Sequence, residues 1–286
     1  MSATTGERVA QPASPEPRVA STTGTRRRGR AGQRMLHIWT WLLIGWLALP
    51  IAVMILFGFN NTKGKFNFTW QGFTLYWWRH LFAIPDLTTA LRNSLTIAVF
   101  STLIATVLGT MIGLALGRHR FRGRGALDVM LFANIAAPEI VLGAALLSLF
   151  IQLNIPRGYG TILIAHVMFN IAYVAVTVRA RVAGFDRSLE EAARDLGASP
   201  LATFRLVTLP LIFPGVLAGA LLSFAMSIDD YIVTAFNAGS TLTFPLWVFG
   251  ATRVGVPPQV NVMGTIIFVG GVALAVGNGV LLRRRR

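Results

Sequence analysis

Long apolar runs alternate with short polar segments along most of this chain. Six runs are long enough, as helices that rise about 1.5 Å per residue, to cross about 30 Å of hydrocarbon. They comprise residues 36–59, 94–116, 127–153, 161–178, 209–232 and 262–282. The pattern therefore predicts an all-α polytopic membrane protein with six transmembrane helices.

Three of these runs contain a proline, at Pro50, Pro138 and Pro214. A proline inside a span frees a backbone carbonyl, which is tolerated where neighbouring helices or water satisfy it. We therefore expect kinks at these positions, facing protein rather than lipid.

Two connections between the runs are apolar as well. Residues 66–81 are rich in Trp, Tyr and Phe, which favours an amphipathic segment at the outer membrane interface. A surface that meets an external binding protein is the alternative. Residues 244–250 are too few to span a membrane, so we predict a surface or re-entrant helix there.

Clusters of arginine fall on one side of the predicted spans. They precede the first run, separate the second from the third and the fourth from the fifth, and end the chain. The opposite connections contain few basic residues. By the positive-inside rule, both termini and the connection around residues 179–208 are predicted to be cytoplasmic.

Composition supports the membrane class, since 54% of the residues are hydrophobic and 13% are charged. The chain has no cysteine, which excludes disulfides and thiolate chemistry. A net charge of +15 is typical of nucleic-acid binding in a soluble protein. Here the arginines flank apolar runs, so topology explains the charge and no nucleic-acid partner is expected.

The first 33 residues differ in composition from the rest. They are rich in Ser, Thr, Pro, Gly and Arg and contain little that could form a core, which predicts a disordered basic cytoplasmic tail. The following apolar run is too long for a signal peptide and lacks a clear cleavage site. Residues 34–286 are predicted to form the transmembrane domain.

A polar island around residues 190–210 lies between two apolar runs. Ala192, Ala193 and Leu196 have helical spacing, Gly197 is a helix stop signal, and Ser199 followed by proline is a helix start signal. We expect two short helices that meet at a bend and present a surface to a soluble partner. An ordinary solvated loop is the alternative.

Apart from Asp128 at the very start of the third run, three acidic residues fall inside predicted spans, where a charge costs about 2.5–3.5 kcal/mol on insertion scales. Glu139 is near the middle of the third span, whereas Asp229 and Asp230 are near the outer end of the fifth. Carboxylates at these two depths would favour a path for a cationic solute. The alternatives are a helix–helix hydrogen bond for Glu139 and an ordinary helix end for the aspartates.

Two tyrosines, Tyr173 and Tyr231, are candidates for cation–π contact with an ammonium group along this path, with aromatic packing as the alternative. His166 and Asn170 share one face of the fourth span, and we interpret them as helix packing rather than ligand contacts. The sequence has no phosphate-binding Gly-x-x-x-x-Gly-Lys-Ser/Thr loop, metal-ligand cluster or hydrolytic triad. If ATP drives this protein, a separate subunit binds it.

The polar island resembles the signature loop of ABC importer permeases. It reads Glu191-Ala192-Ala193, three residues, Gly197, nine residues, and then Val207-x-Leu209-Pro210, with valine where the family usually has isoleucine. The resemblance implies a coupling helix that docks into a groove on a cytoplasmic ATPase. The residues implied in this coupling are Glu190, Glu191, Ala192, Ala193, Gly197, Leu209 and Pro210.

Further segments resemble the second permease subunit of spermidine/putrescine ABC importers. They are residues 72–75, 93–95, 138–143, 227–230 and 254–261, so the likeness covers nearly everything after residue 35. Glu139 stands where many of these relatives have aspartate. The resemblance implies a type I importer permease fold in the inner membrane. The partners that it implies are a second permease, an extracytoplasmic binding protein and an ATPase dimer, and the implied substrate is a polyamine. The ATPase dimer would bind ATP and Mg, whereas this chain would bind no cofactor.

Other functions stay open on these residues. Permeases for an opine, iron(III) or thiamine share the coupling motif. From another class, an independent channel or a proton-coupled carrier could use Glu139 and would need no ATPase. An intramembrane enzyme is disfavoured because no paired catalytic set is evident.

Overall fold

The computed structural model describes residues 30–64 and 66–284, and this part of the chain is almost entirely helical. The helices are α1 (Arg30–Phe57), α2 (Tyr76–Arg79), α3 (Pro85–Arg118), α4 (Arg124–Ala136), α5 (Glu139–Gln152), α6 (Tyr159–Ala183), α7 (Ser188–Asp195), α8 (Pro200–Thr203), the π-helix η1 (Phe204–Thr208), α9 (Leu209–Asp229), α10 (Ile232–Asn237), α11 (Phe244–Ala251) and α12 (Pro258–Arg284). The chain divides within α1 into two compact units, residues 1–49 and 50–286. The predicted tail lies outside the described residues up to residue 29.

Five helices in the described part are long and apolar enough to span a membrane: α1, α3, α6, the run from α8 to α9, and α12. Pro50 and Pro214 lie inside continuous helices. The third predicted span is different, because α4 and α5 are bent by 110° relative to each other. Counting this bent pair as one span gives the six that the sequence predicts.

The prediction of a continuous, kinked third helix is wrong. Ala137 and Pro138 both have extended backbone, with ψ near 135° and 133°. Proline disfavours helical conformation in the residue before it and has no amide to donate, so α4 ends and α5 starts afresh at Glu139. The fifth span also ends earlier than predicted, at Asp229, because Asp230 is extended as well.

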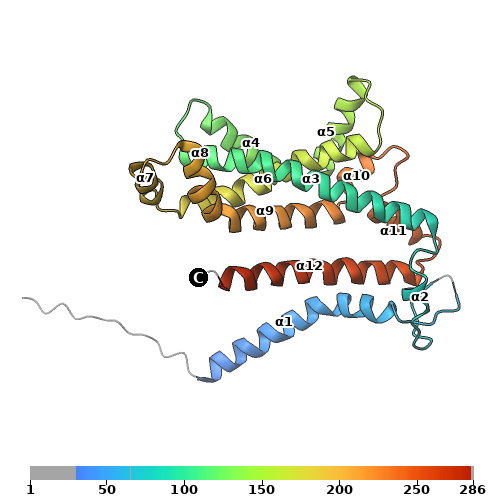
Figure 1. The fold of residues 1–286 in the computed structure, drawn as a ribbon. Helices are drawn as coiled ribbons and strands as arrows, with labels where there is room; N and C mark the ends of the chain where they lie inside the picture. Colours follow the sequence, from blue (N-terminus) through green and yellow to red (C-terminus); the bar gives the residue numbers. More distant parts are fainter. Residues whose placement is uncertain (1–29, 65, 285–286) are drawn as a thin grey trace, which may run out of the picture. The chain divides into compact units, whose positions relative to one another are not determined.

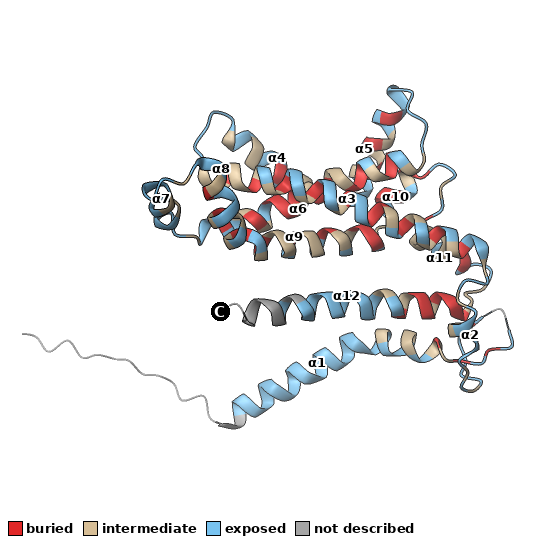
Figure 2. Cartoon of the chain, viewed as in Figure 1, coloured by how far each residue is buried: buried red, intermediate tan, exposed pale blue. Residues whose placement is uncertain are grey.

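The core of residues 50–286 is formed where α3, α6 and α9 run side by side (Figure 1), and the buried residues concentrate along their shared faces (Figure 2). Gly109, Gly113 and Gly117 recur every four residues and therefore line one face of α3. Valines of α6 fill the groove that these glycines leave. The buried residues of this cluster are Val174, Val178, Val182 and Ile212.

Gly113→Ala is expected to destabilise this contact. An added Cβ would lie 2.7 Å from the Ala175 carbonyl oxygen and 3.0 Å from Val178 Cβ, and the carbonyl belongs to a helix that cannot yield locally. Overpacking of this kind costs about 1–3 kcal/mol. Thermal unfolding of the purified protein should show a lower midpoint than wild type, whereas Gly250→Ala, with open space around its Cβ, should not. Equal midpoints for both variants would contradict the packing described here.

The connection between α1 and α2 is a loop held by a buried asparagine, with one short helix at its end. Asn60 Nδ2 donates to Asn67 Oδ1 and to the Thr69 carbonyl, each at 2.7 Å, and Asn60 Oδ1 accepts from the Gln71 amide at 2.7 Å. The sequence predicted an amphipathic segment over residues 66–81. Only α2 is helical there, because the asparagine contacts and a bridge between Asn60 and Phe73 hold the rest extended.

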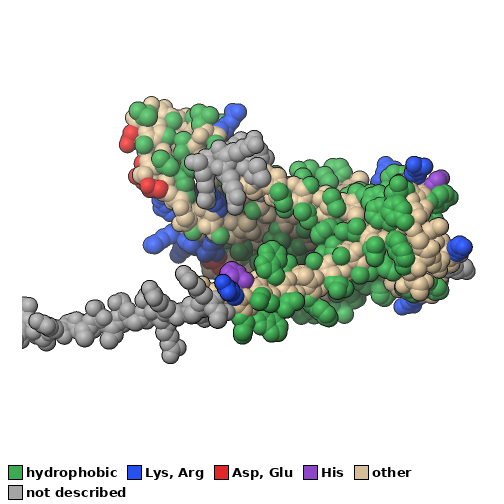
Figure 3. All heavy atoms as spheres, turned by 90° about the horizontal axis from the view of Figure 1, so that it is seen from below, with side chains coloured by type: hydrophobic (Ala, Val, Ile, Leu, Met, Phe, Trp, Pro, Cys, Tyr) green, Lys and Arg blue, Asp and Glu red, His purple; other side chains and the backbone are tan. Residues whose placement is uncertain are grey.

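The helix predicted at residues 244–250 is confirmed as α11, whose side chains pack around Leu87, Val260 and Met263. The buried part of α12 lies at this end, as Figure 2 shows. Hydrophobic side chains cover much of the face in Figure 3, whereas the acidic side chains on that face gather at the end that carries α7. Lys and Arg side chains lie at both ends of this face, and an apolar flank between charged ends is typical of a protein with its helices in a bilayer.

Candidate functional site

Two helix breaks meet at one cavity. The break before Glu139 lies at the start of α5, and the break after Asp229 lies between α9 and α10. Helices α5 and α10 pack closely, since an added Cβ on Gly143 would lie 2.7 Å from the Phe236 ring. This packing brings the acidic residues of both breaks to the same place.

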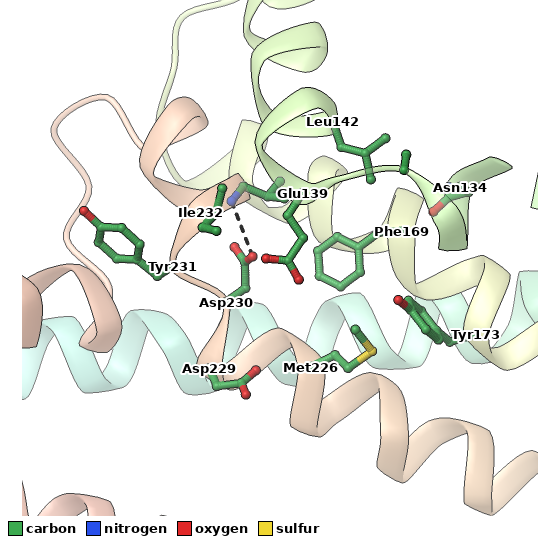
Figure 4. A pocket seen from close by; sticks show the side chains of 12 residues that line it. Asn134, Glu139, Leu142, Phe169, Tyr173, Met226, Asp229, Asp230, Tyr231 and Ile232 are labelled. Carbon is green, nitrogen blue, oxygen red and sulfur yellow. Dashed lines mark hydrogen bonds between the residues drawn. The ribbon is translucent and has the colours of Figure 1, made fainter.

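The cavity has a volume of about 420 Å³ and combines acidic, aromatic and apolar side chains (Figure 4). It is lined by Asn134, Ala137, Glu139, Leu142, Phe169, Tyr173, Met226, Asp229, Asp230, Tyr231, Ile232 and Val233. The sequence placed Glu139 and the aspartates at two depths along separate spans. The structure brings all three to one cavity, because the sharp bend after α4 turns the start of α5 toward the end of α9.

The three carboxylates are oriented differently (Figure 4). The carboxylates of Glu139 and Asp230 point toward one another, whereas the Asp229 side chain lies apart from both. Glu139 and Asp229 are exposed, and within the described residues neither carboxylate has a hydrogen-bond or ion-pair partner. Of the described residues that line this cavity, Glu139 and Asp229 are therefore the two exposed carboxylates without a partner.

Asp230 is the buried member of this group, with its side chain 5% exposed. Its Oδ2 accepts from the Thr234 amide at 2.8 Å and from Thr234 Oγ1 at 2.7 Å, and its Oδ1 accepts from the Val233 amide at 3.4 Å. It thereby satisfies amides in the first turn of α10, which carry no helical partner. His166 Nε2 lies 3.3 Å from the same Oδ2.

His166 is buried between three helices, which confirms its interpretation as a packing residue. Its Nδ1 lies 2.6 Å from Ser227 Oγ on α9 and its Nε2 lies 2.9 Å from Thr234 Oγ1 on α10. Asn170 is also buried on α6. Sequence reasoning missed the contact between His166 and Asp230, and the available signal was a histidine inside an otherwise apolar span.

The two predicted tyrosines lie at different places around the cavity. Tyr173 lies beside Phe169 and Met226 in the lining. Tyr231 points away from the carboxylates (Figure 4), and its ring packs against that of Phe249 with centroids 4.6 Å apart. Tyr173 therefore keeps a face toward the cavity, whereas the ring of Tyr231 is taken up in aromatic packing.

The predicted bend in the polar island is confirmed. Helix α7 is followed by Gly197 with φ of +85°, and Ser199 Oγ accepts from the Ala202 amide at 3.3 Å at the start of α8. A positive φ favours glycine because it has no Cβ. Glu191, Ala192 and Gly197 are exposed, and Leu196 next to the bend is 90% exposed.

Glu190 points inward, unlike Glu191. Arg118 Nη1, at the end of α3, donates to Glu190 Oε2 at 2.8 Å, and Thr208 Oγ1 donates to Glu190 Oε1 at 2.5 Å. The Arg118 guanidinium also lies over the Phe185 ring, 4.5 Å from its centroid. Leu209 and Pro210 then begin α9. Glu190 thus joins α7 to the ends of α3 and α9.

Comparison with known proteins agrees with this architecture. The family described as "Binding-protein-dependent transport system inner membrane component" matches residues 109–282. The spermidine/putrescine transport system permease protein PotC of Haemophilus influenzae is 39% identical over 244 residues, covering 85% of this chain and 94% of that protein. The putrescine transport system permease protein PotI of Escherichia coli K12 is 38% identical over 236 residues, covering 79% and 83%.

Solved structures show the same fold at lower identity. A bacterial ABC transporter involved in alginate import has a TM-score of 0.61 at 20% identity, covering 89% of this chain and 98% of that one. The MetNI methionine ABC transporter has a TM-score of 0.57 at 17% identity, covering 69% and 95%. The chain belongs to the family of binding-protein-dependent transport system inner membrane components and has the type I fold of ABC importer permeases.

Proposed function

We propose that this permease subunit imports polyamines and supplies half of the path that they take through the membrane. The observation that supports this most directly is the cavity that gathers Glu139, Asp229 and Asp230. A polyamine carries ammonium groups separated by methylene chains. Separate carboxylates on two sides of a cavity suit such a solute better than one deep cage. The permeases PotC and PotI, similar over most of this chain, are named for the same solutes.

The uncharged lining of the cavity suits the rest of a polyamine. Phe169 and Tyr173 present aromatic rings, and an ammonium group over such a ring gains about 0.5–2 kcal/mol. Leu142 and Met226 offer apolar contact for methylene groups. An anionic solute would be repelled by the carboxylates and a neutral one would gain hydrogen bonds but no charge attraction, which is why a polycation is proposed.

The exposed face of the polar island is proposed to dock an ABC ATPase. Leu196, Leu201 and Leu206 are 90%, 66% and 76% exposed in a segment that also carries many charged side chains. Large apolar side chains exposed beside such charges mark interaction surfaces. The ATPase would be a dimer that binds ATP and Mg, with a second permease completing the path and an extracytoplasmic protein delivering substrate.

The internal contacts of Glu190 provide the mechanical link. Motion of α7, when the ATPase closes, would be carried through Arg118 to α3 and through Thr208 to α9. The far end of α9 is Asp229, at the cavity. A displacement at the docking face can therefore reach the carboxylates along one continuous helix and change the side from which the cavity is open.

The docking face and both termini are proposed to be cytoplasmic. Arg118 at the end of α3 meets α7, whereas Asn93, nearer the start of α3, donates to the Leu242 carbonyl at 2.8 Å. The arginine-rich loop that follows α3 and the arginine-rich segment that contains α7 therefore lie at the same end of α3, as the positive-inside rule requires. Reporter fusions at residues 122 and 195 should both be cytoplasmic, and an external location of either would contradict the orientation.

Purification of the tagged chain from its own membranes tests the assembly. An ATPase and a second multispanning protein should accompany it, and the complex should hydrolyse ATP. A proton-coupled carrier using Glu139 would instead be purified alone and would transport in response to a pH gradient without ATP. The second result would refute the proposed function.

A further inference from the structure

A second cavity meets the cavity of Figure 4 at the break between α9 and α10. It has a volume of about 450 Å³ and is lined by the end of α9, by α11 and by the first half of α12. Asp229 and Tyr231 line both cavities. We call the cavity of Figure 4 the acidic cavity and this one the apolar cavity. Asp229, whose side chain lies apart from those of Glu139 and Asp230, is the carboxylate that they share (Figure 4).

The apolar cavity differs from the acidic one in its chemistry. Among the described residues that line it, Asp229 is the only one with a charged side chain, and most of the others are hydrophobic or aromatic. The Thr252 hydroxyl donates to the Phe249 carbonyl at 2.7 Å, so it has no free proton for a ligand. A ligand therefore meets one negative charge at the edge shared with the acidic cavity and mainly hydrocarbon beyond it.

The walls of the apolar cavity are held by contacts that do not involve a ligand. The ring of Tyr231 packs against that of Phe249, with centroids 4.6 Å apart. The start of α11 is fixed to α3, because the Phe244 amide donates to Ser94 Oγ at 2.9 Å. Phe249 and Thr252 are exposed, so the cavity is open at the end of α11. A preformed cavity of this kind binds at a lower cost in ordering.

The shared carboxylate decides which occupant the apolar cavity suits. An ammonium group at Asp229 pairs with the carboxylate, and the methylene groups bonded to that ammonium can then lie against the apolar wall. A lipid tail or an apolar helix in the cavity would instead cover the carboxylate without giving it a partner, which costs free energy. The cavity therefore suits an aliphatic chain that begins with a cation.

We propose that the apolar cavity is a subsite for the additional arm of a triamine, and that it makes this permease favour spermidine over putrescine. Putrescine has an ammonium group at each end of one methylene chain, and Glu139 and Asp229 can hold both in the acidic cavity. Spermidine has a further methylene arm that ends in another ammonium. Its middle ammonium pairs with Asp229, the added arm lies along Val248 and Ile267, and the last ammonium stays at the open end. This assignment rests on the proposed polyamine transport.

Filling the apolar cavity tests the subsite by transport. Thr252→Phe adds bulk at the open end without removing a core side chain, and Val248→Phe adds it in the wall. Each should lower the ratio of spermidine to putrescine uptake by the reconstituted complex about tenfold, because only the triamine loses apolar contact. Val254→Phe is the control and should keep the wild-type ratio, since Val254 is 69% exposed and lines neither cavity.

The outcomes of this assay separate the subsite from polyamine import itself. The binding protein is the same in every sample, so a changed ratio belongs to this chain. Uptake of both amines at an unchanged ratio in the two filling variants, or an equal fall with Val254→Phe, would overturn the subsite alone. A wild-type complex that takes up neither amine would refute the proposed function and the subsite with it.

Labelling of an introduced cysteine tests what occupies the apolar cavity. The chain has no cysteine, so Thr252→Cys gives it a single thiol, at the open end. In the intact complex a charged maleimide should modify this thiol, and spermidine should slow the reaction whereas putrescine should not. Val254→Cys should react at the same rate with either amine. A Thr252→Cys thiol protected without any amine would show that lipid or another subunit covers the cavity. That result, or equal protection by both amines, would overturn the proposal.

Discussion

Gly197→Val should leave the transporter assembled in the membrane but lower its ATP-driven transport by about tenfold. Gly197 adopts a φ of +85°, where a β-branched residue is a genuine outlier. The left-handed region costs about 1–2 kcal/mol for an L-residue, and about 1.4 kcal/mol changes an equilibrium tenfold. Relief of this strain would turn α7 relative to α8, so the docking face would lose its shape. Uptake and ATP hydrolysis should be measured together in the reconstituted complex.

Two matched variants separate this bend from general backbone strain. Gly197→Asn should largely restore transport, because asparagine tolerates the left-handed region. Gly123→Val imposes similar strain, with φ of +92° and open space around its Cβ, but lies outside the polar island. It should therefore transport nearly as wild type does. Equal losses from Gly123→Val and Gly197→Val would argue against a special role for the bend.

Neutralising both open carboxylates with Glu139→Gln and Asp229→Asn is expected to abolish most polyamine uptake. Each carboxylate attracts an ammonium group at about 4 Å by about 1 kcal/mol in water and about 4 kcal/mol near a protein surface. Both residues are exposed, so the lower part of this range applies and each single variant should lose about tenfold. The losses should appear chiefly as a higher KM, because the charges act on binding.

Asp86→Asn is the control for this experiment. Asp86 is an exposed carboxylate in the first turn of α3 and does not line the cavity. Its neutralisation changes the net charge by the same amount and should leave the KM near that of wild type. If Asp86→Asn and Glu139→Gln behave alike, general charge rather than the cavity controls uptake.

The transmembrane spans could be predicted because their signal is continuous and local. Long apolar runs gave the positions of α1, α3, α6, α9 and α12, within a few residues at most ends. The stop at Gly197 and the start at Ser199 were predictable for the same reason, since a helix end depends on a few neighbouring residues. The role of these residues toward an ATPase stays a prediction.

The geometry of the cavity could not be predicted in the same way. Hydrophobic pattern does not distinguish a proline kink from a 110° break, so Glu139 was placed inside a continuous span. Its approach to Asp230 depends on the packing of α5 against α10, between residues far apart in the sequence. The same holds for His166 and Asp230, and for Arg118 and Glu190, which meet only once three helices have packed.

The most direct test of the account is accumulation of labelled spermidine and putrescine in proteoliposomes that contain the purified complex and its extracytoplasmic binding protein. We predict accumulation that requires ATP and the binding protein, that is competed by other polyamines, and that disappears when this chain is left out of the complex. Accumulation that persists without ATP or without this chain would contradict the account, as would transport restricted to neutral or anionic solutes.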